Sequence, residues 1–205
     1  MDNINENQKN KWYAEHENIL IEWADKAMCY RWLHSKAHNL FSYKNAWFTI
    51  PVIVISTCTG TANFAQDRVS EDYRNYVVMI VGAFNILAGI ITTIQQFLKV
   101  TQLNEAHRVS CIAWGKFHRN IKMELSKRPD ERMPVTNMLK ISKEEFDRLM
   151  ETSPTIPDEI VDEFNTTFPV EDLNSPDQSG DLKKNIMGTL NNYGEYSQFA
   201  RPEVC

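Results

Sequence analysis

Two long runs without a charged residue dominate the hydrophobic pattern of this chain. They cover residues 45–66 and 75–98. As helices, the runs would be about 33 and 36 Å long, and the hydrocarbon core of a bilayer is about 30 Å thick. Helices buried in a soluble core are also apolar all round. Two runs of this length in a chain of 205 residues favour two transmembrane helices.

Each run contains a polar stripe at helical spacing. The stripe of the second run consists of Gly82, Asn85, Gly89, Thr92, Gln96 and Lys99, and that of the first run of Thr49, Val52, Ser56, Thr59 and Asn63. Small and polar residues hold membrane helices together, because lipid supplies no hydrophobic force between them. The stripes therefore indicate either helix packing or the lining of a water-filled pore. The amides of Asn85 and Gln96 favour the pore, because a tight contact does not readily satisfy all their hydrogen-bonding groups.

The segments on either side of the runs have amphipathic helical patterns. Residues 12–44 predict a helix, and residues 99–128 predict a continuation of the second span as one rod, ending near Pro129. The two seams that we expect to pack together contain His16, Leu20, Trp23, Ala27, Tyr30, His34, Ala37 and Phe41, and then Leu103, Ala106, Ser110, Ala113, Phe117, Ile121 and Leu125. A basic helix lying on the membrane surface is the alternative. The acidic residues mixed into 12–44 favour the bundle.

Beyond Pro129 the sequence predicts short helices within residues 142–165. Ser142 and Glu145 form a capping-box pattern, and a second short helix is predicted to follow Pro157. We expect residues 1–11 to be disordered and residues 166–205 to form a mostly disordered polar tail, which would recruit a cytoplasmic partner. The fold class expected for residues 12–165 is therefore all-α.

The placement of charge predicts the orientation in the membrane. The average composition, with 24% charged residues and a net charge of −5, is typical of a soluble domain, but the charges are unevenly placed. The predicted outer loop, residues 67–74, contains two basic residues, whereas basic residues are frequent before the first run and after the second. The positive-inside rule then places both termini in the cytoplasm. The opening residues lack the pattern of a cleavable signal peptide.

Signals for catalysis are nearly absent from the sequence. The nucleotide-binding, serine-hydrolase and zinc-protease motifs do not occur. His34 and His38 are one helical turn apart, but a lone pair is more often packed or solvated than metal-bound. We therefore expect no enzyme, no metal, no cofactor and no nucleic-acid partner.

Three segments of the sequence carry a family resemblance, namely KAMCYRWLHSKAHNLFSYKNAWFTIPVIVISTCTG, EAHRVSCIAWGKFHRNIKMEL after the second run, and SPTIP. Together they resemble the SLATT superfamily, the SMODS and SLOG-associating two-transmembrane effectors. The resemblance covers roughly residues 12–160. It implies an oligomeric, pore-forming membrane effector, which in bacteria is often coupled to nucleotide second messengers. No nucleotide-sensing domain is evident in this chain.

The function expected from these patterns is a homo-oligomeric ion channel or pore. The second run would line the pore, with Lys99 at the cytoplasmic mouth, while Asp67, Glu71 and Asp72 would lie at the outer mouth. The partners would be the lipid bilayer, further copies of the chain and permeant ions. The alternative is a non-conducting scaffold, in which the membrane hairpin anchors a cytoplasmic bundle and a tail that recruits partners.

Overall fold

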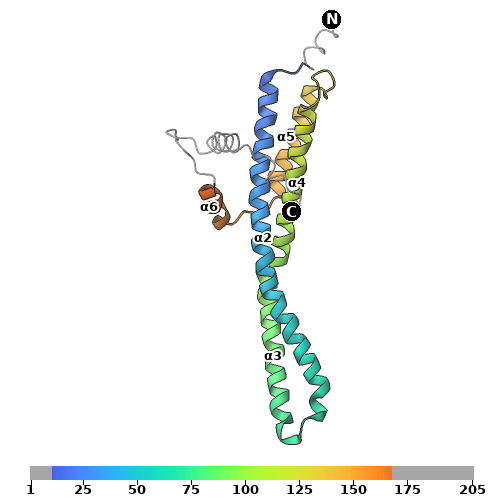
Figure 1. Cartoon of the computed structure of the whole chain (residues 1–205), viewed down its shortest axis with the longest axis vertical. Helices are drawn as coiled ribbons and strands as arrows, with labels where there is room; N and C mark the ends of the chain where they lie inside the picture. Colours follow the sequence, from blue (N-terminus) through green and yellow to red (C-terminus); the bar gives the residue numbers. More distant parts are fainter. Residues whose placement is uncertain (1–10, 168–205) are drawn as a thin grey trace. The chain divides into compact units, whose positions relative to one another are not determined.

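The computed structural model describes residues 11–167, and within this range the chain forms helices and no strand (Figure 1). The elements are α2 (Ala14–Ala65), the short 3-10 helix η1 (Gln66–Arg68), α3 (Glu71–Phe97), α4 (Val100–Leu125), α5 (Val135–Thr152) and α6 (Asp158–Thr167). The all-α prediction is confirmed for this part of the chain. The predictions of disorder for residues 1–10 and 168–205 lie outside the described residues, whereas residues 166 and 167 belong to the end of α6.

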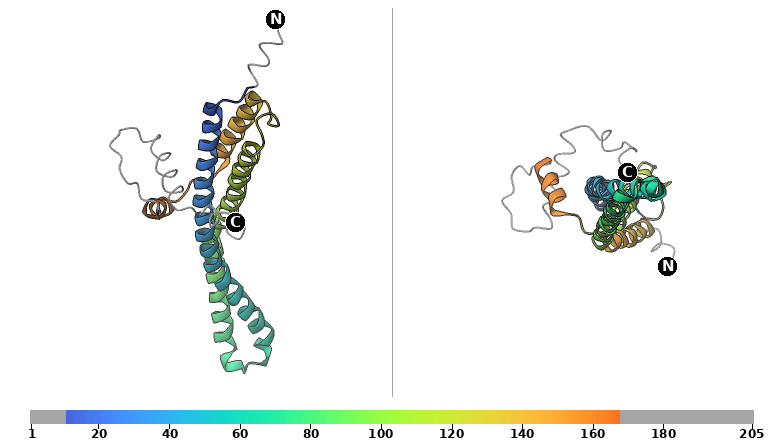
Figure 2. Two further views of the ribbon diagram at one scale, coloured as in Figure 1. Left: turned by 45° about the horizontal axis from the view of Figure 1, so that its top comes forward. Right: turned by 90° about the horizontal axis from the view of Figure 1, so that it is seen from below.

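The described residues form two compact units, and both α2 and α4 contribute residues to each of them. One unit, the bundle, contains residues up to Ala37 and from Ala106 onward, and the other, the helix pair, contains His38–Glu105. In the bundle, the first part of α2 lies beside α4 and α5 (Figures 1 and 2). Each of the three helices supplies residues to one apolar core, which consists of Leu20, Ala24, Ala27, Trp114, Phe117, Ile121, Met138 and Leu149.

The centre of the bundle is Trp114, which is fully buried. Its ring stacks on Tyr30 of α2 at a centroid distance of 4.8 Å and meets Phe146 of α5 edge-on at 5.4 Å. The indole N–H donates to Ser153 Oγ at 3.1 Å. Offset and edge-on aromatic pairs of this kind add to the free energy gained from burial alone. The predicted packing of the two seams is confirmed at Leu20, Ala27, Phe117 and Ile121, which are buried together in this core.

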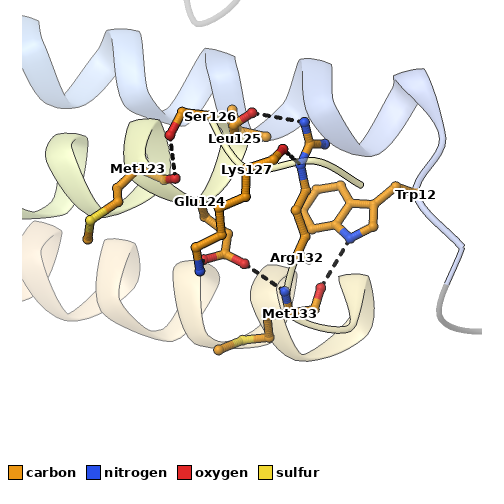
Figure 3. Close-up of polar contacts among 8 residues, drawn as sticks. All are labelled: Trp12, Met123, Glu124, Leu125, Ser126, Lys127, Arg132 and Met133. Carbon is orange, nitrogen blue, oxygen red and sulfur yellow. Dashed lines mark hydrogen bonds and ion pairs between the residues drawn. The ribbon is translucent and has the colours of Figure 1, made fainter. Parts of the chain in front are cut away.

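The connection between α4 and α5 is closed by side chains that satisfy free backbone groups (Figure 3). Arg132 donates to the carbonyl oxygens of Leu125 at 2.8 Å and Lys127 at 2.9 Å, at the end of α4 where helix carbonyls lack partners. Glu124 accepts from the Met133 N–H at 2.6 Å, and Trp12 Nε1 donates to the Met133 carbonyl at 3.1 Å. The turn is therefore tied to the end of α4 and to Trp12, which lies just before α2.

The last described helix, α6, docks on α2 through apolar and charged contacts. Phe164 is buried and meets the Trp32 ring edge-on at 5.3 Å. Lys36 Nζ lies 2.6 Å from Glu163 Oε1. This pair is largely exposed, so the buried aromatic contact contributes more than the ion pair.

In the second unit, α3 returns antiparallel to the end of α2 (Figure 1). The two helices share a narrow buried face. On α3 this face includes Val81, Ala88 and Gln95, which are spaced by seven residues. On α2 it includes Thr59, which is 5% exposed. A spacing of seven is typical of helices that pack side by side in pairs.

Two helices of the described part are long and apolar enough to cross a membrane, one beginning at Ala14 and the other at Glu71. In the most apolar stretch of each helix, only 6% and 11% of the residues, respectively, are buried. A helix in the core of a soluble protein would bury most of its apolar stretch. The helix pair instead exposes large apolar side chains, among them Trp47, Ile50, Ile53, Phe64, Met79, Ile86, Ile90 and Phe97.

Two boundary predictions in the helix pair are wrong. The predicted single rod through residues 75–128 is broken, because α3 ends at Phe97 and α4 begins at Val100, with Lys99 at a φ of 51°. The predicted loop 67–74 is shorter, because α3 already begins at Glu71. Glu71 and Asp72 therefore lie in the first helical turn, where acidic side chains complement the helix dipole.

The predicted start of the helix at Ser142 is also wrong. Helix α5 begins at Val135, directly after Pro134, and Ser142 lies inside it, 4% exposed. The apolar spacing of Val135, Met138 and Leu149 already indicated the longer helix. The capping-box pattern at Ser142 was therefore coincidental. The second short helix, after Pro157, is confirmed as α6.

Candidate functional site: the polar faces of the helix pair

The predicted stripe of α3 lies next to the buried face of the helix pair, not on it. Gly82, Gly89 and Gln96 each follow a residue of the buried face by one position, which corresponds to a rotation of about 100° around the helix. Asn85, Gly89, Gln96 and Lys99 are exposed, while Gly82 and Thr92 are half-buried. The contact of α3 with α2 thus leaves most of this stripe uncovered.

The amides of the α3 stripe have no hydrogen-bond partner within residues 11–167. Neither Asn85 nor Gln96 makes a side-chain hydrogen bond in this range. Thr92 differs, because its hydroxyl donates to the Ala88 carbonyl of its own helix at 2.9 Å. Asn85 and Gln96 are therefore the two stripe residues whose polar groups need water or another molecule.

The glycines of the α3 stripe are not required by packing inside the described part of the chain. Apart from the backbone of its own helix turn and its chain neighbours, a Cβ atom placed on Gly82 or Gly89 would meet no atom of residues 11–167 within 4 Å. Glycine in the middle of a helix costs roughly 0.5–1 kcal/mol relative to alanine. The described chain offers nothing that would compensate for this cost at either position.

The predicted stripe of α2 is divided between two environments. Thr49 accepts a hydrogen bond from Gln95 Nε2 at 3.0 Å, and the buried Thr59 donates to the Ser56 carbonyl at 3.2 Å. Val52 is half-buried, whereas the side chains of Ser56 and Asn63 are exposed. Part of this stripe is thus used to pack α2 on α3.

The acidic residues predicted at the outer mouth surround the connection between α2 and α3. Asp67 has an 88% exposed side chain and lies 3.7 Å from Arg74 Nη2. Glu71 and Asp72 are exposed at the start of α3. An ion pair this exposed contributes little to stability, so the Asp67 carboxylate remains accessible to solvent and ions.

A polar cluster at the opposite end of the helix pair was missed by the sequence reasoning. Gln95 Nε2 lies 2.8 Å from Asn45 Oδ1 and 3.4 Å from Thr101 Oγ1, and Thr101 Oγ1 donates to Asn45 Oδ1 at 2.8 Å. The helical period had singled out Gln96, whereas its neighbour Gln95 lies on the buried face. The signal in the sequence was the spacing of seven residues from Val81 to Ala88 and from Ala88 to Gln95, which places Gln95 on the same face as the two apolar residues.

The histidines pair across the bundle rather than along α2. His34 and His107 are both buried, and their Nδ1 atoms are 2.9 Å apart, so that one nitrogen donates and the other accepts. His38 instead contacts the Asn104 carbonyl at 3.2 Å. Burial, and secondly His107, lower the pKa of His34 to about 4. No group of three metal-ligating side chains occurs in the described part of the chain.

No family model, no curated protein and no solved structure matches this chain.

Proposed function

We propose that the chain is a membrane protein that assembles with further copies of itself into an ion-conducting pore, as its resemblance to the SLATT superfamily implies. In this proposal, the ends of α2 and α3 form a two-span hairpin with both chain termini in the cytoplasm. The stripe of α3 lines the pore. Asp67, Glu71 and Asp72 lie at the outer mouth, and Lys99 lies at the cytoplasmic mouth.

The observation that carries the proposal is the exposure of Asn85 near the middle of α3. Most of the surface around α3 is apolar, as expected of a lipid-facing helix, and Asn85 has no hydrogen-bond partner within residues 11–167. Polar groups without partners are costly in lipid and occur mainly in protein contacts or beside water-filled cavities. A pore between copies provides water at this position.

The uncovered glycines support the assembly of several copies. Because Gly82 and Gly89 are not used for packing within residues 11–167, they are available for close approach of a neighbouring copy or for widening a lumen. One helix pair alone is too thin to enclose a water-filled channel. Assembly accounts for the glycines and for Asn85 at once.

The aromatic residues of the helix pair support the membrane placement. Tyr43 and Trp47 are exposed near one end of the apolar segment, and Tyr73 and Tyr76 are exposed near the other. Tyrosine and tryptophan are enriched at the two membrane–water interfaces. From Trp47 to Phe64, which is also exposed, α2 rises about 26 Å, close to the thickness of the hydrocarbon core.

A non-conducting scaffold is the second candidate function. The compact aromatic core of the bundle favours it, because such a bundle could present a stable surface to a partner without any ion movement. In that case Asn85 would be satisfied by a contact with another protein.

Ion flux into liposomes and planar-bilayer recording would test the proposal. We would compare the purified wild-type chain with Asn85→Leu and with Ile94→Leu, which changes an exposed apolar residue away from the stripe. A pore predicts discrete conductance that Asn85→Leu abolishes or reduces at least tenfold and that Ile94→Leu retains. A stable oligomer that is silent at all voltages and ion gradients would favour the scaffold.

A further inference from the structure

The second membrane helix contains a break that lysine is poorly suited to form. Lys99 has a φ of 51°, in the left-handed region that glycine adopts without penalty. The Leu98 N–H still donates to the Ile94 carbonyl at 3.0 Å, whereas the Lys99 N–H donates to Gln96 at 3.1 Å, which is a tighter turn. A new helix then starts at Val100. Surrounding contacts must therefore hold Lys99 in this conformation.

The break changes which face of the helix is buried. Before it, Ala88 and Gln95 follow the seven-residue spacing, and a straight helix would next bury Gln102 and Val109. Both of these residues are exposed. The buried series instead resumes at Val100, which is 3% exposed, and continues through His107, Trp114 and Ile121. The series of buried positions therefore shifts by two residues at the break, because Val100 is buried where an unbroken helix would bury Gln102.

Asn45, Gln95 and Thr101 connect the two sides of the break, and we call them the polar clamp. Gln95 lies in the last turns of α3, Thr101 lies in the first turn of α4, and both bond to Asn45 Oδ1 of α2 at 2.8 Å. Straightening the break would rotate Thr101 around the helix axis relative to Gln95. The two side chains could then no longer share one acceptor.

We propose that the polar clamp positions Lys99: by holding the break, it fixes the direction of the ammonium group at the cytoplasmic mouth and so sets the charge selectivity of the pore. This inference rests on the proposed pore. The clamp residues do not belong to the α3 stripe and act through Lys99. A ring of fixed Lys99 ammonium groups repels cations and attracts anions.

Hydrogen exchange followed by mass spectrometry would test the structural half of this inference without any need for conductance. We would measure the backbone amides of residues 95–104 in the full chain in nanodiscs. Gln95→Leu and Thr101→Val are expected to change exchange at least tenfold there, because a break that is no longer held either loosens, which speeds exchange, or straightens into continuous helix, which slows it. Thr93→Val is the matched control, because the Thr93 side chain is exposed and its hydroxyl donates to the Gly89 carbonyl of its own helix at 2.8 Å. Unchanged exchange in Gln95→Leu would overturn the inference.

Reversal potentials across a salt gradient would test the link to Lys99. Lys99→Gln is expected to shift the reversal potential toward cation selectivity, and Gln95→Leu to shift it in the same direction, while Thr93→Val leaves it unchanged. Changed exchange in Gln95→Leu without a shift in its reversal potential would overturn the positioning role. A wild-type chain that never conducts would overturn both the proposed function and the selectivity role, whereas the exchange measurement would still decide whether the clamp holds the break.

Discussion

His34 and His107 share one hydrogen bond, in which a single proton lies between their Nδ1 atoms. With Nδ1 atoms 2.9 Å apart, one ring must present a lone pair to the N–H of the other. If both rings were charged, two cations would be adjacent among buried residues. Burial therefore keeps the pKa of His34 at about 4, well below the ordinary value of 6.5.

This low pKa predicts that the bundle loses stability in acid. Between pH 6.5 and 4, His34 is protonated in the unfolded chain but neutral in the folded chain, so the free energy of unfolding falls as the pH drops. The expected slope is at most about 1.4 kcal/mol per pH unit, and the contribution is constant above pH 6.5. Chemical unfolding of the detergent-solubilised protein, followed by tryptophan fluorescence at several pH values, measures it.

Two other buried groups make a control necessary. Burial also lowers the pKa of His118, which adds to the acid sensitivity, whereas burial raises the pKa of Asp25, which opposes it. His34→Asn keeps a polar atom near the position of Nδ1 and is expected to flatten the profile. His16→Asn, at the start of α2, should retain the wild-type slope. An equally steep profile in His34→Asn would contradict the assignment.

The conformation of Lys99 gives a second prediction at the residue scale. A left-handed conformation costs a residue other than glycine about 1–2 kcal/mol, and more if the residue is β-branched. Lys99→Gly is therefore expected to raise the free energy of unfolding by up to about 1 kcal/mol, and Lys99→Val to lower it. Thermal unfolding in detergent ranks the variants. A valine variant as stable as the wild type would mean that the helix is continuous at this point.

At the scale of elements, α2 is one helix in two surroundings. Its first part buries Leu20, Ala24 and Ala27 against α4 and α5, whereas its end exposes Trp47 and Phe64. The same backbone pattern is stable in both cases, because a helix satisfies its own backbone hydrogen bonds in water and in lipid alike. What differs along α2 is only which side chains need a partner.

The packing of α4 on α5 predicts a measurable cost at Trp114. Trp114→Ala removes a fully buried ring that contacts Tyr30 and Phe146, and should lower the free energy of unfolding by about 3–5 kcal/mol. Ser153→Ala, which removes only the acceptor of the indole N–H, should cost about 1 kcal/mol. Urea unfolding measures both variants. Equal costs would show that the hydrogen bond, and not the ring, carries the contact.

At the scale of the whole molecule, the proposed topology makes opposite predictions for two exposed serines. Ser70 precedes α3, and Ser126 follows α4. In a cysteine-free background in intact cells, a membrane-impermeant maleimide is expected to label Ser70→Cys and not Ser126→Cys. Labelling of both after permeabilisation controls for reactivity. The reverse pattern would invert the orientation, and labelling of both variants in intact cells would contradict the two-span arrangement.

Features that depend on neighbouring residues along the chain could be predicted from the sequence. The uncharged runs, the amphipathic helix of residues 12–44 and the short helix after Pro157 are local patterns, and the helices appear where these patterns lie. The start of α5 differs from the prediction, because the capping pattern at Ser142 predicts a start that the apolar spacing from Val135 onward overrides. Here two local signals competed, and burial against α2 and α4 favoured the apolar one.

By itself, the sequence determined that the described chain is helical and that two of its helices are apolar enough to cross a membrane, because hydrogen bonding within helices and the transfer of side chains from water are properties of nearby residues. Only the tertiary structure decided that Gln95, not Gln96, lies on the buried face, that His34 meets His107, and that the long helix breaks at Lys99. These features depend on which residues of a distant helix face them. A helical period fixes the spacing of a stripe but not the rotation at which the helix packs.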